Sequence, residues 1–277
     1  MHFYVKLGAA ALLASAVAVP AAWAGETLDR VMSTKTLTMS SDPEYPPQSF
    51  LNDKNEMDGF DVDVGKEIAK RMGAELKIVT PGWDIITAGS WGGRWDMSVG
   101  SMTPTKKRAE VLDFPAVYYY TPAAFAVHKD SDMDSLDDLN GKVIGSCGGC
   151  TYDAYLMKDL EIDAEGAPPF EYEVEAGEIK TYETDTHAFD DLALGDGARL
   201  DAVFSALPTI QEAIKKGGYP MKVIGKPAFY EPLSVATDKG DPEFDAKIAE
   251  VVAAMKSDGT LKKLSEKWYG VDLTTVQ

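Results

Sequence analysis

The sequence predicts an α/β protein built from two lobes. Between residues 36 and 99, short apolar runs alternate with helical patterns, and this β-α-β-α-β order favours a parallel sheet covered by helices. The alternation breaks at residues 118–128, a second α/β series follows, and residues 230–236 form another extended stretch. Two extended crossovers flanking one contiguous α/β block indicate that the chain leaves a first lobe, builds a second and returns. We expect residues 25–123 plus 231–277 in lobe 1, and residues 124–230 in lobe 2.

In the first lobe, the helix expected at residues 66–72 shows the clearest period, because Ile68 and Met72 share one face with Val64 and Gly73 follows as a stop. The other expected elements there are strands at 36–41, 76–79 and 97–99 and a helix at 83–91. In the second lobe they are helices at 136–139, 151–158, 188–194 and 208–216 and strands at 142–145, 200–204 and 221–224, followed by C-terminal helices at 241–256 and 261–269. Residues 159–183 are acidic and rich in turn residues, so we expect them at the surface.

The N-terminus predicts a cleaved signal peptide over residues 1–24. A basic residue, Lys6, precedes an apolar run from 7 to 19, and the small residues Ala22 and Ala24 form a cleavage pattern before Gly25. The apolar run is shorter than the ~20 residues that a membrane span requires, and no cysteine stands at the cleavage point to carry a lipid. We therefore expect an exported, soluble mature chain in the periplasm.

The mature chain is strongly acidic. The full sequence has 27 Lys and Arg residues against 45 Asp and Glu, a net charge of −18, and loss of Lys6 with the signal peptide makes it −19. This charge argues strongly against nucleic acid as a partner, because phosphate contacts need clustered basic residues. It does not identify a small solute, since net charge governs solubility and long-range steering.

The two cysteines of the chain, Cys147 and Cys150, stand in a Cys-Gly-Gly-Cys turn. In an oxidising compartment this spacing favours a small structural disulfide. The alternative is a redox-active pair, since a thiol at a helix start has a lowered pKa. The flanking residues lack a thioredoxin-like pattern, and no nearby histidine completes a zinc site. The sequence leaves the disulfide itself open, and we expect no cofactor and no metal.

Residues 100–108 carry the chemistry of an anion site. They follow a strand and start a helix, where backbone N–H groups are unpaired, and they include the hydroxyls of Ser101 and Thr103 and the guanidinium of Arg108. A guanidinium fork matches the two oxygens of a carboxylate. The alternative is an ordinary N-cap followed by a basic surface helix. Two other polar turns, residues 42–47 and 146–151, also follow strands, and in open α/β sheets such ends border the ligand crevice.

A series of short motifs extends over essentially all of residues 27–270. The motifs are Asp42-x-x-Tyr45-Pro46-Pro47, Gly59-Phe60-Asp61-Val62-Asp63, Arg94-Trp95-Asp96, Thr103-x-Thr105-x-x-Arg108 with Asp113-Phe114, Tyr118-Tyr119-Tyr120, Leu136-x-Asp138-Leu139-x-Gly141-Lys142, Leu200-Asp201-Ala202-Val203 and Leu261-x-x-Leu264-x-x-Lys267-Trp268. In this order and spacing the chain resembles the extracytoplasmic solute-binding proteins of ABC importers, of the polar amino-acid type (family 3). The resemblance implies a type II periplasmic-binding-protein fold, with two hinge strands and a ligand cleft between the lobes. It also implies docking on a permease in the inner membrane, and we expect a monomer.

Carried over position by position, the resemblance implies that Arg108 clamps a carboxylate of the solute and that Thr103 adds its hydroxyl and N–H. In the second lobe, Gly149 and Thr151 match a family turn that usually reads Gly-Thr-Thr or Gly-Ser-Thr, from which Cys150 departs. Thr151 would close on the same carboxylate, and it also suits the N-cap of the helix that follows. Hydrogen bonds from both lobes exist only when the cleft is shut, so the solute favours the closed state.

Four further positions complete the predicted site. Asp42 and Tyr45 match positions that often meet the side chain of the solute, Trp83 one that packs on its stem, and Ser101 adds a hydroxyl. Asp42 accepts hydrogen bonds either from an amine, guanidinium or amide of the solute or, as an Asx-turn, from its own backbone. Trp83 otherwise belongs to the core.

The sequence departs from the family at Ala206. Members that bind α-amino acids end this strand, which begins at Asp201, with an aspartate that holds the α-ammonium, and here a methyl group takes its place. A buried ammonium without a partner is costly. Either Ser205, Ser101, Asp42 or another carboxylate accepts the ammonium, or the solute has none there.

The sequence therefore predicts a binding protein without enzymatic activity. It would serve an ABC importer by closing its lobes on a small carboxylate-bearing solute, an amino acid or an amino-acid-like molecule. The alternative is a periplasmic enzyme on the same fold, of the cyclohexadienyl dehydratase type. Such an enzyme needs an acid in the cleft, for which Asp42 and Glu44 are the candidates.

Overall fold

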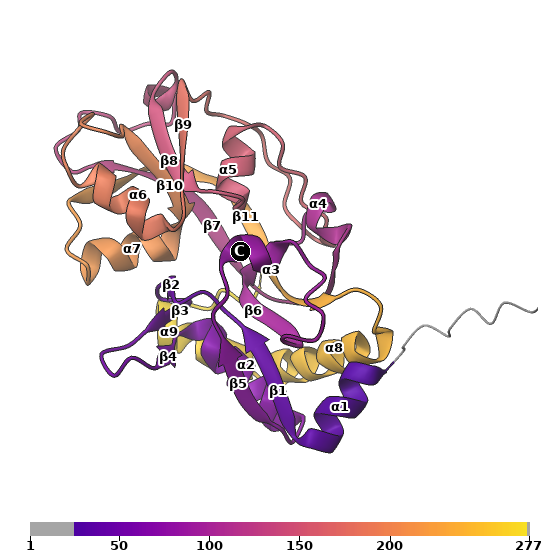
Figure 1. Ribbon diagram of the computed structural model, residues 1–277. Helices are drawn as coiled ribbons and strands as arrows, with labels where there is room; N and C mark the ends of the chain where they lie inside the picture. The colour runs from indigo at the N-terminus through magenta and orange to yellow at the C-terminus, as the bar shows by residue number, and fades with distance from the viewer. Residues whose placement is uncertain (1–24, 276–277) are drawn as a thin grey trace, which may run out of the picture.

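Eight strands form one sheet in the computed structural model, which describes residues 25–275. Their order is β5-β1-β6-β11-β7-β10-β8-β9, and the two halves of this sheet belong to the two lobes seen in Figure 1. The predicted signal peptide, residues 1–24, lies outside the described residues. Among the described residues, no helix is both long and apolar enough to cross a membrane.

The first half of the sheet is parallel, as the β-α-β-α-β pattern predicts. β1 (Thr36–Ser40) pairs in parallel with β5 (Glu75–Val79) on one side and β6 (Met97–Met102) on the other. Between β1 and β5 the chain forms α2 (Phe60–Arg71), whose apolar face is buried. The ends of β1 and β6 carry the turns in which the sequence places polar site residues.

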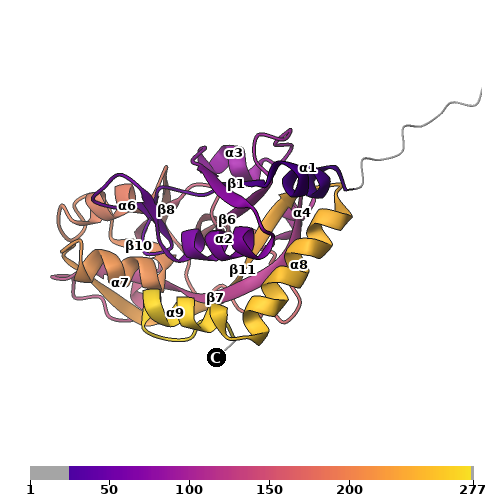
Figure 2. The same ribbon diagram turned by 90° about the horizontal axis from the view of Figure 1, so that it is seen from below.

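Four further helices and a small second sheet also belong to this lobe. The helices are α1 (Glu26–Thr34), α3 (Trp83–Thr87), α8 (Pro242–Ser257) and α9 (Thr260–Tyr269), and the small antiparallel sheet contains β2 (Glu44–Tyr45), β3 (Ser49–Leu51) and β4 (Met57–Asp58). Figure 2 shows α2, α8 and α9 on one side of the molecule, and all three pack against one another. The small sheet is absent from the sequence prediction, because its strands of two or three residues carry no readable alternation.

The second lobe repeats the α/β arrangement. β8 (Val143–Cys147) pairs in parallel with β9 (Glu178–Tyr182) and β10 (Ala202–Ala206). The helices of this lobe are α5 (Thr151–Leu156), α6 (Asp185–Leu192) and α7 (Leu207–Lys215), with a short 3-10 turn η1 (Asp137–Leu139). β9 lies in the stretch expected only as surface. It is an edge strand with exposed polar residues, which explains why its composition suggests a turn-rich segment.

Two long strands join the lobes. β7 (Leu112–His128) and β11 (Met221–Asp238) pair antiparallel over most of their length and run from one lobe into the other (Figure 1). Both predicted crossovers are parts of these strands. The pairing is irregular between Ile224 and Phe229, within the second lobe. α4 (Lys106–Ala109) lies between β6 and β7.

Each lobe has its own apolar core. In the first lobe Phe60, Tyr118 and Phe244 belong to one buried cluster, whereas Phe125 and Phe204 belong to another in the second lobe. Because these cores do not merge, the lobes are connected chiefly through the two long strands and through polar contacts across the cleft. Such a construction is suited to hinge motion.

Candidate ligand-binding site

A pocket between the lobes encloses about 540 Å³, its open mouth included. The lining residues are Asp42, Glu44, Tyr45, Trp83, Gly100, Ser101, Thr103, Arg108, Cys147, Cys150, Thr151, Tyr152, Glu183, Thr184, Asp185 and Glu231. Seven of the eight residues predicted from the sequence are therefore brought together here. The eighth, Gly149, is attached to the site through its backbone carbonyl.

Arg108 is the third residue of the four-residue helix α4. Thr105 caps this helix and accepts a hydrogen bond from the Arg108 N–H at 3.2 Å. The guanidinium donates to the carbonyl oxygens of Thr103 at 2.9 Å and Gly149 at 3.0 Å, and it lies 5.3 Å from the centre of the Trp83 ring. Thr103 is in lobe 1 and Gly149 in lobe 2, so one side chain ties the lobes together.

Burial lowers the pKa of Arg108 to about 10, and the negative charge of Glu231 opposes this change. The guanidinium therefore stays charged at neutral pH. It is the one Lys or Arg side chain among the lining residues. The pocket consequently has a single fixed positive charge.

Glu231 occupies the centre of the predicted anion site. This carboxylate is only 2 % exposed and accepts hydrogen bonds from Thr103 Oγ1 at 2.6 Å, Thr151 Oγ1 at 2.7 Å and the Tyr152 hydroxyl at 2.6 Å. Burial raises the pKa of Glu231, while the three hydroxyls and Arg108 lower it. The hydroxyls that the resemblance assigns to a carboxylate of the solute thus hold a carboxylate of the protein.

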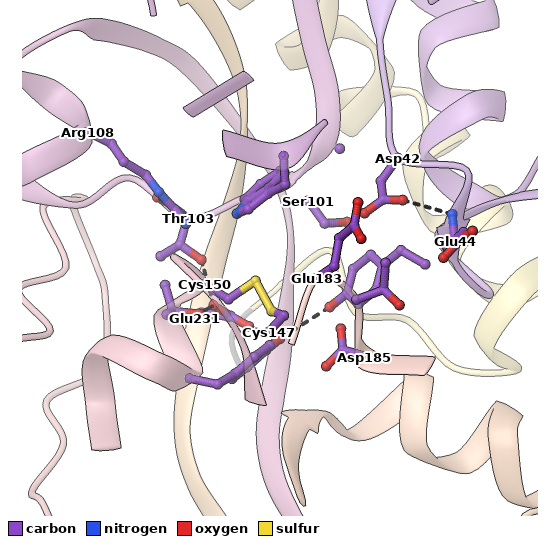
Figure 3. A pocket seen from close by; sticks show the side chains of 16 residues that line it. Asp42, Glu44, Ser101, Thr103, Arg108, Cys147, Cys150, Glu183, Asp185 and Glu231 are labelled. Carbon is purple, nitrogen blue, oxygen red and sulfur yellow. Dashed lines mark hydrogen bonds between the residues drawn. A yellow bond between two sulfur atoms is a disulfide. The ribbon is translucent and has the colours of Figure 1, made fainter. Parts of the chain in front are cut away.

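Four other carboxylates gather on the opposite side. Figure 3 shows Asp42, Glu44, Glu183 and Asp185 together, facing Thr103, Arg108 and Glu231 across the pocket. Within the described residues, none of these four carboxylates lies within 4.0 Å of a Lys, Arg or His nitrogen. The two sides therefore differ in how their charges are balanced.

Asp185 is the most buried carboxylate of that group. It is the first residue of α6, is 5 % exposed, and has no hydrogen-bond partner for its Oδ1 atom. Burial raises the pKa of Asp185 to about 7, the nearby Ser205 hydroxyl lowers it, and the charges of Asp42 and Glu231 raise it further. A buried polar atom without a partner is uncommon in folded proteins and calls for an explanation.

Asp42 forms the Asx-turn that the sequence offers as an alternative to a ligand contact. Its Oδ1 accepts a hydrogen bond from the Glu44 N–H at 2.8 Å, and burial raises its pKa. Tyr45, on β2, reaches across the cleft, where its hydroxyl lies 3.2 Å from that of Tyr152 on α5. Because the Tyr152 hydroxyl also donates to Glu231, a short chain of hydroxyls connects the two sides of the pocket.

Ser101 lies at the pocket wall, but its hydroxyl belongs to a network inside the first lobe. It donates to Asp61 Oδ2 at 2.7 Å and lies 2.6 Å from the Tyr119 hydroxyl. Tyr118 donates to the other oxygen of Asp61 at 2.7 Å. Ser101 therefore supports the end of β6 and has no proton left to donate to a solute.

Cys147 and Cys150 form a disulfide that lines the pocket, as the spacing favours. Ala206, in contrast, is fully buried in the core of the second lobe and is absent from the pocket wall. Its neighbour Ser205 is the residue whose hydroxyl influences Asp185. In residues 25–275, no three or more His, Cys, Asp or Glu side chains are grouped so that they could hold a metal ion.

The sequence pattern of the bacterial extracellular solute-binding proteins, family 3, matches residues 37–271. This chain belongs to that family. The resemblance noted from short motifs is thereby confirmed, and so is the two-lobe fold, because solved amino-acid-binding proteins superimpose on it. The family match covers both lobes and the two long strands between them.

Several family members are similar to this chain along most of its length. The L-cystine-binding protein TcyJ of Escherichia coli K12 is 28% identical over 249 residues, which are 89% of this chain and 87% of that protein. The L-arginine-binding protein of Pseudomonas aeruginosa is 27% identical and covers 89% of this chain and 93% of its own. Relatives of this chain are thus named as amino-acid-binding proteins, several of them of ABC transporters.

Solved structures give the same result for the fold. The ancestral amino-acid-binding protein AncCDT-1, described as a precursor of cyclohexadienyl dehydratase, superimposes with a TM-score of 0.74 at 29% identity, covering 88% of this chain and 100% of its own. A substrate-binding protein of an ABC uptake transporter from Streptococcus pneumoniae, solved with bound histidine, superimposes with a TM-score of 0.76 at 22% identity, covering 91% and 99%.

Glu231 and Asp185 are missing from the residues predicted from the sequence. For Glu231 a signal exists, because it is the one charged residue between 229 and 237 in an otherwise apolar and hydroxyl-bearing strand. A lone charge in such a run marks a buried, partnered group. For Asp185 the signal is weaker, since it lies between the expected surface segment, residues 159–183, and the helix that the pattern predicts from residue 188.

Proposed function

We propose that this chain is the solute-binding component of an amino-acid ABC importer and that its solute binds in the pocket between the lobes. The observation that carries this proposal is the convergence of polar side chains from both lobes and from β11 on one pocket. A solute that contacts both lobes stabilises their closed arrangement. The permease, expected in the inner membrane, would then recognise the closed form.

The hinge follows from the same geometry. We place lobe 1 at residues 25–123 plus 231–277 and lobe 2 at residues 124–230, so that the boundaries fall within β7 and β11. The contacts of Arg108 with Gly149 and of Glu231 with Thr151 would break when the cleft opens. A solute would supply the additional contacts that favour closure.

The proposed binding residues are the eight predicted from the sequence, seven of which line the pocket. Arg108 and Trp83 form one wall, Asp42 and Tyr45 another, and Thr103, Thr151 and Ser101 shape the turns between them, with Gly149 holding Arg108. Donors and acceptors of both charges suit a small polar solute of amino-acid size.

Thermal denaturation in the presence of small solutes tests this function. We expect at least one of the twenty amino acids, or of the amines derived from them by decarboxylation, to raise the melting temperature of the mature chain. A ligand at 100 times its Kd stabilises the folded state by ~2.7 kcal/mol, which is a shift of several degrees. If none of these solutes shifts the melting temperature, the proposed function is wrong.

The Arg108→Ala variant tests whether the solute binds in this pocket. We expect it to fold and to lose the ligand-induced shift, because it removes the hydrogen bond that ties the lobes together at Gly149 and the guanidinium that packs on Trp83. Lys107→Ala is the matched control, since Lys107 is an exposed cation on the same helix. A full ligand-induced shift in Arg108→Ala would contradict the assignment of the pocket.

Binding without chemical conversion is part of the proposal. The enzymatic alternative retains one supporting fact, since AncCDT-1 is described as a precursor of a dehydratase. Incubation of the purified chain with prephenate or arogenate, followed by chromatography, should return the unchanged compound. Formation of the dehydrated product would overturn this part.

We also propose export to the periplasm through cleavage before Gly25, with the mature protein acting as a monomer and without nucleic-acid partners. The family to which the chain belongs is extracellular, and the surface is acidic. The mass of the protein recovered from the periplasm would give the cleavage point, and a mass of the full 277-residue chain would contradict it.

A further inference from the structure

The pocket has many more negative than positive groups. Its lining includes the carboxylates of Asp42, Glu44, Glu183, Asp185 and Glu231 and the single guanidinium of Arg108. Clustered acidic residues alone do not define a ligand, because each carboxylate can be solvated or bonded within the protein. The hydrogen-bond partners of the two most buried carboxylates, Glu231 and Asp185, show which interactions a solute has to supply.

The Glu231 carboxylate obtains its hydrogen-bond donors from the protein itself. It takes the hydroxyl protons of Thr103, Thr151 and Tyr152, and each hydroxyl has only one proton to donate. A carboxylate of the solute at this position would find these donors occupied and would bring a second negative charge beside Glu231. Arg108 is no substitute for all of them, since two of its N–H groups already bond to backbone carbonyls.

Asp185 is in the opposite state. It is almost fully buried, its Oδ1 has no partner, and it lines the pocket, on the side that Asp42 and Glu183 share (Figure 3). A buried carboxylate needs hydrogen-bond donors and a compensating charge. The described part of the chain offers no cation within 4.0 Å of it. The Ser205 hydroxyl influences Asp185 as a neutral hydrogen-bond donor, so the compensating charge is what the protein lacks. A ligand with charged N–H groups supplies this charge together with a donor for Oδ1.

We infer that the solute is a small organic cation, a primary amine or a guanidinium, whose N–H groups bond to Asp185, and that Glu231 occupies the place of a solute carboxylate. This inference rests on the proposed function and narrows its solute class. It also accounts for Ala206, because the acceptor that the family has at that strand end is replaced by a carboxylate from the start of α6, beside Ser205. The solute then requires no carboxylate of its own.

Matched pairs of solutes that differ only in a carboxylate test the inference. Arginine is compared with agmatine, lysine with cadaverine, and any other amino acid that binds with its decarboxylated amine, by calorimetric titration of the mature chain. We expect at least one amine to bind as tightly as its amino acid or more tightly. Glutarate, an anion without an amine, should not bind.

Asp185→Asn is the decisive variant, because it keeps the shape of the side chain and removes its charge. We expect it to weaken amine binding by roughly tenfold to a hundredfold, as for the loss of a charged hydrogen bond. Asp190→Asn is the control, since it makes the same change at an exposed position of α6, outside the pocket, where the carboxylate accepts from Tyr219. It should leave the Kd unchanged.

The outcomes separate this inference from the proposed function. If an amino acid binds in an Arg108-dependent manner and its amine binds more than about tenfold more weakly, the solute carboxylate is recognised; the inference is then wrong and the proposed function stands. If Asp185→Asn binds amines like the unaltered chain, the inference is also wrong. If neither amino acids nor amines bind, both proposals fail together.

Discussion

Each side of the pocket contains a buried carboxylate, and the two carboxylates differ in their hydrogen bonding and charge environment. Glu231 has three hydroxyl donors within 2.7 Å and lies in the field of Arg108, whereas Asp185 has an oxygen without a partner and is repelled by Asp42 and Glu231. Both side chains are almost fully excluded from water. One side is therefore complete without a solute, and the other becomes complete only when positive charge arrives.

This difference teaches where to look for ligand chemistry in a member of a known family. The side that matches the family motifs, with Arg108, Thr103 and Thr151, is the side whose hydroxyl donors are already occupied. The opposite side, to which the motifs contribute Asp42 and Tyr45, carries the unsatisfied group, Asp185, which lies outside the motifs. Unfilled hydrogen-bonding capacity is thus more informative about the solute here than the motif residues are.

The Glu231→Ala variant removes the carboxylate whose hydrogen bonds are already satisfied. It has the largest expected effect on solute affinity. The change frees the hydroxyls of Thr103 and Thr151 and removes the negative charge that excludes a second carboxylate. We expect the Kd of arginine to fall about a hundredfold relative to the Kd of agmatine, because two to three charged hydrogen bonds become available to the arginine carboxylate. Calorimetric titration of both solutes measures this ratio.

The control for that variant is Glu250→Ala, which removes an exposed carboxylate of α8 far from the pocket lining. It should leave the preference for agmatine unchanged. An unchanged preference in Glu231→Ala itself would show that Glu231 does not hold the place of a solute carboxylate.

Two conservative variants should change the free energy of unfolding of the unliganded protein in opposite directions. Thr103→Val removes a donor from the buried Glu231 carboxylate and should lower the free energy of unfolding by about 1–3 kcal/mol at pH 8. Asp185→Asn removes a buried charge without a partner and should raise it by a similar ~1–3 kcal/mol. Denaturant unfolding at pH 8 and pH 5 measures both.

The pH dependence of the Asp185→Asn effect follows from the raised pKa. A carboxyl whose pKa is about 7 in the folded protein, above its ordinary 3.8, binds its proton more tightly when folded, so the unaltered chain loses stability as pH rises between these values. The advantage of Asp185→Asn should therefore be largest above pH 7 and shrink at pH 5. A destabilising effect of Asp185→Asn at pH 8 would mean that Asp185 already has a partner in the unliganded protein.

Much of the fold could be predicted because it depends on local patterns. The parallel pairing of β1 with β5 and β6 follows from alternating strands and helices, and the two crossovers appear as breaks in that alternation. The small sheet with β2 and the edge strand β9 could not be predicted, since two-residue strands and polar edge strands differ little from turns in composition.

The candidate site was predictable where it lies at strand ends and unpredictable where it depends on tertiary contacts. Arg108 and Asp42 follow strands in the sequence, and the structure brings both to the pocket. Glu231 lies within a long strand, and only the pairing of β11 with β7 between the lobes places it beside Thr103 and Thr151. Sequence spacing contains no information on which hydroxyls would meet which carboxylate.

Proton release on solute binding tests the central claim most directly, because it reports on Asp185 itself. The charged and titratable groups that face Asp185 are Asp42 from the β1–β2 turn, Tyr45 from β2, Tyr152 from α5 and Glu231 from β11. With a pKa of about 7, the Asp185 carboxyl is protonated in roughly half of the molecules at pH 7. A cationic solute bonds to the ionised form, so the proton must leave.

The measurement is the binding enthalpy at pH 7 of the tightest-binding amine, in two buffers of different ionisation enthalpy. We predict a net release of protons on binding and a smaller release from Asp185→Asn, in which Asp42 and Glu231 keep their raised pKa values. A binding enthalpy that is the same in both buffers, or one that indicates proton uptake, would contradict the account of a pocket completed by the positive charge of its solute.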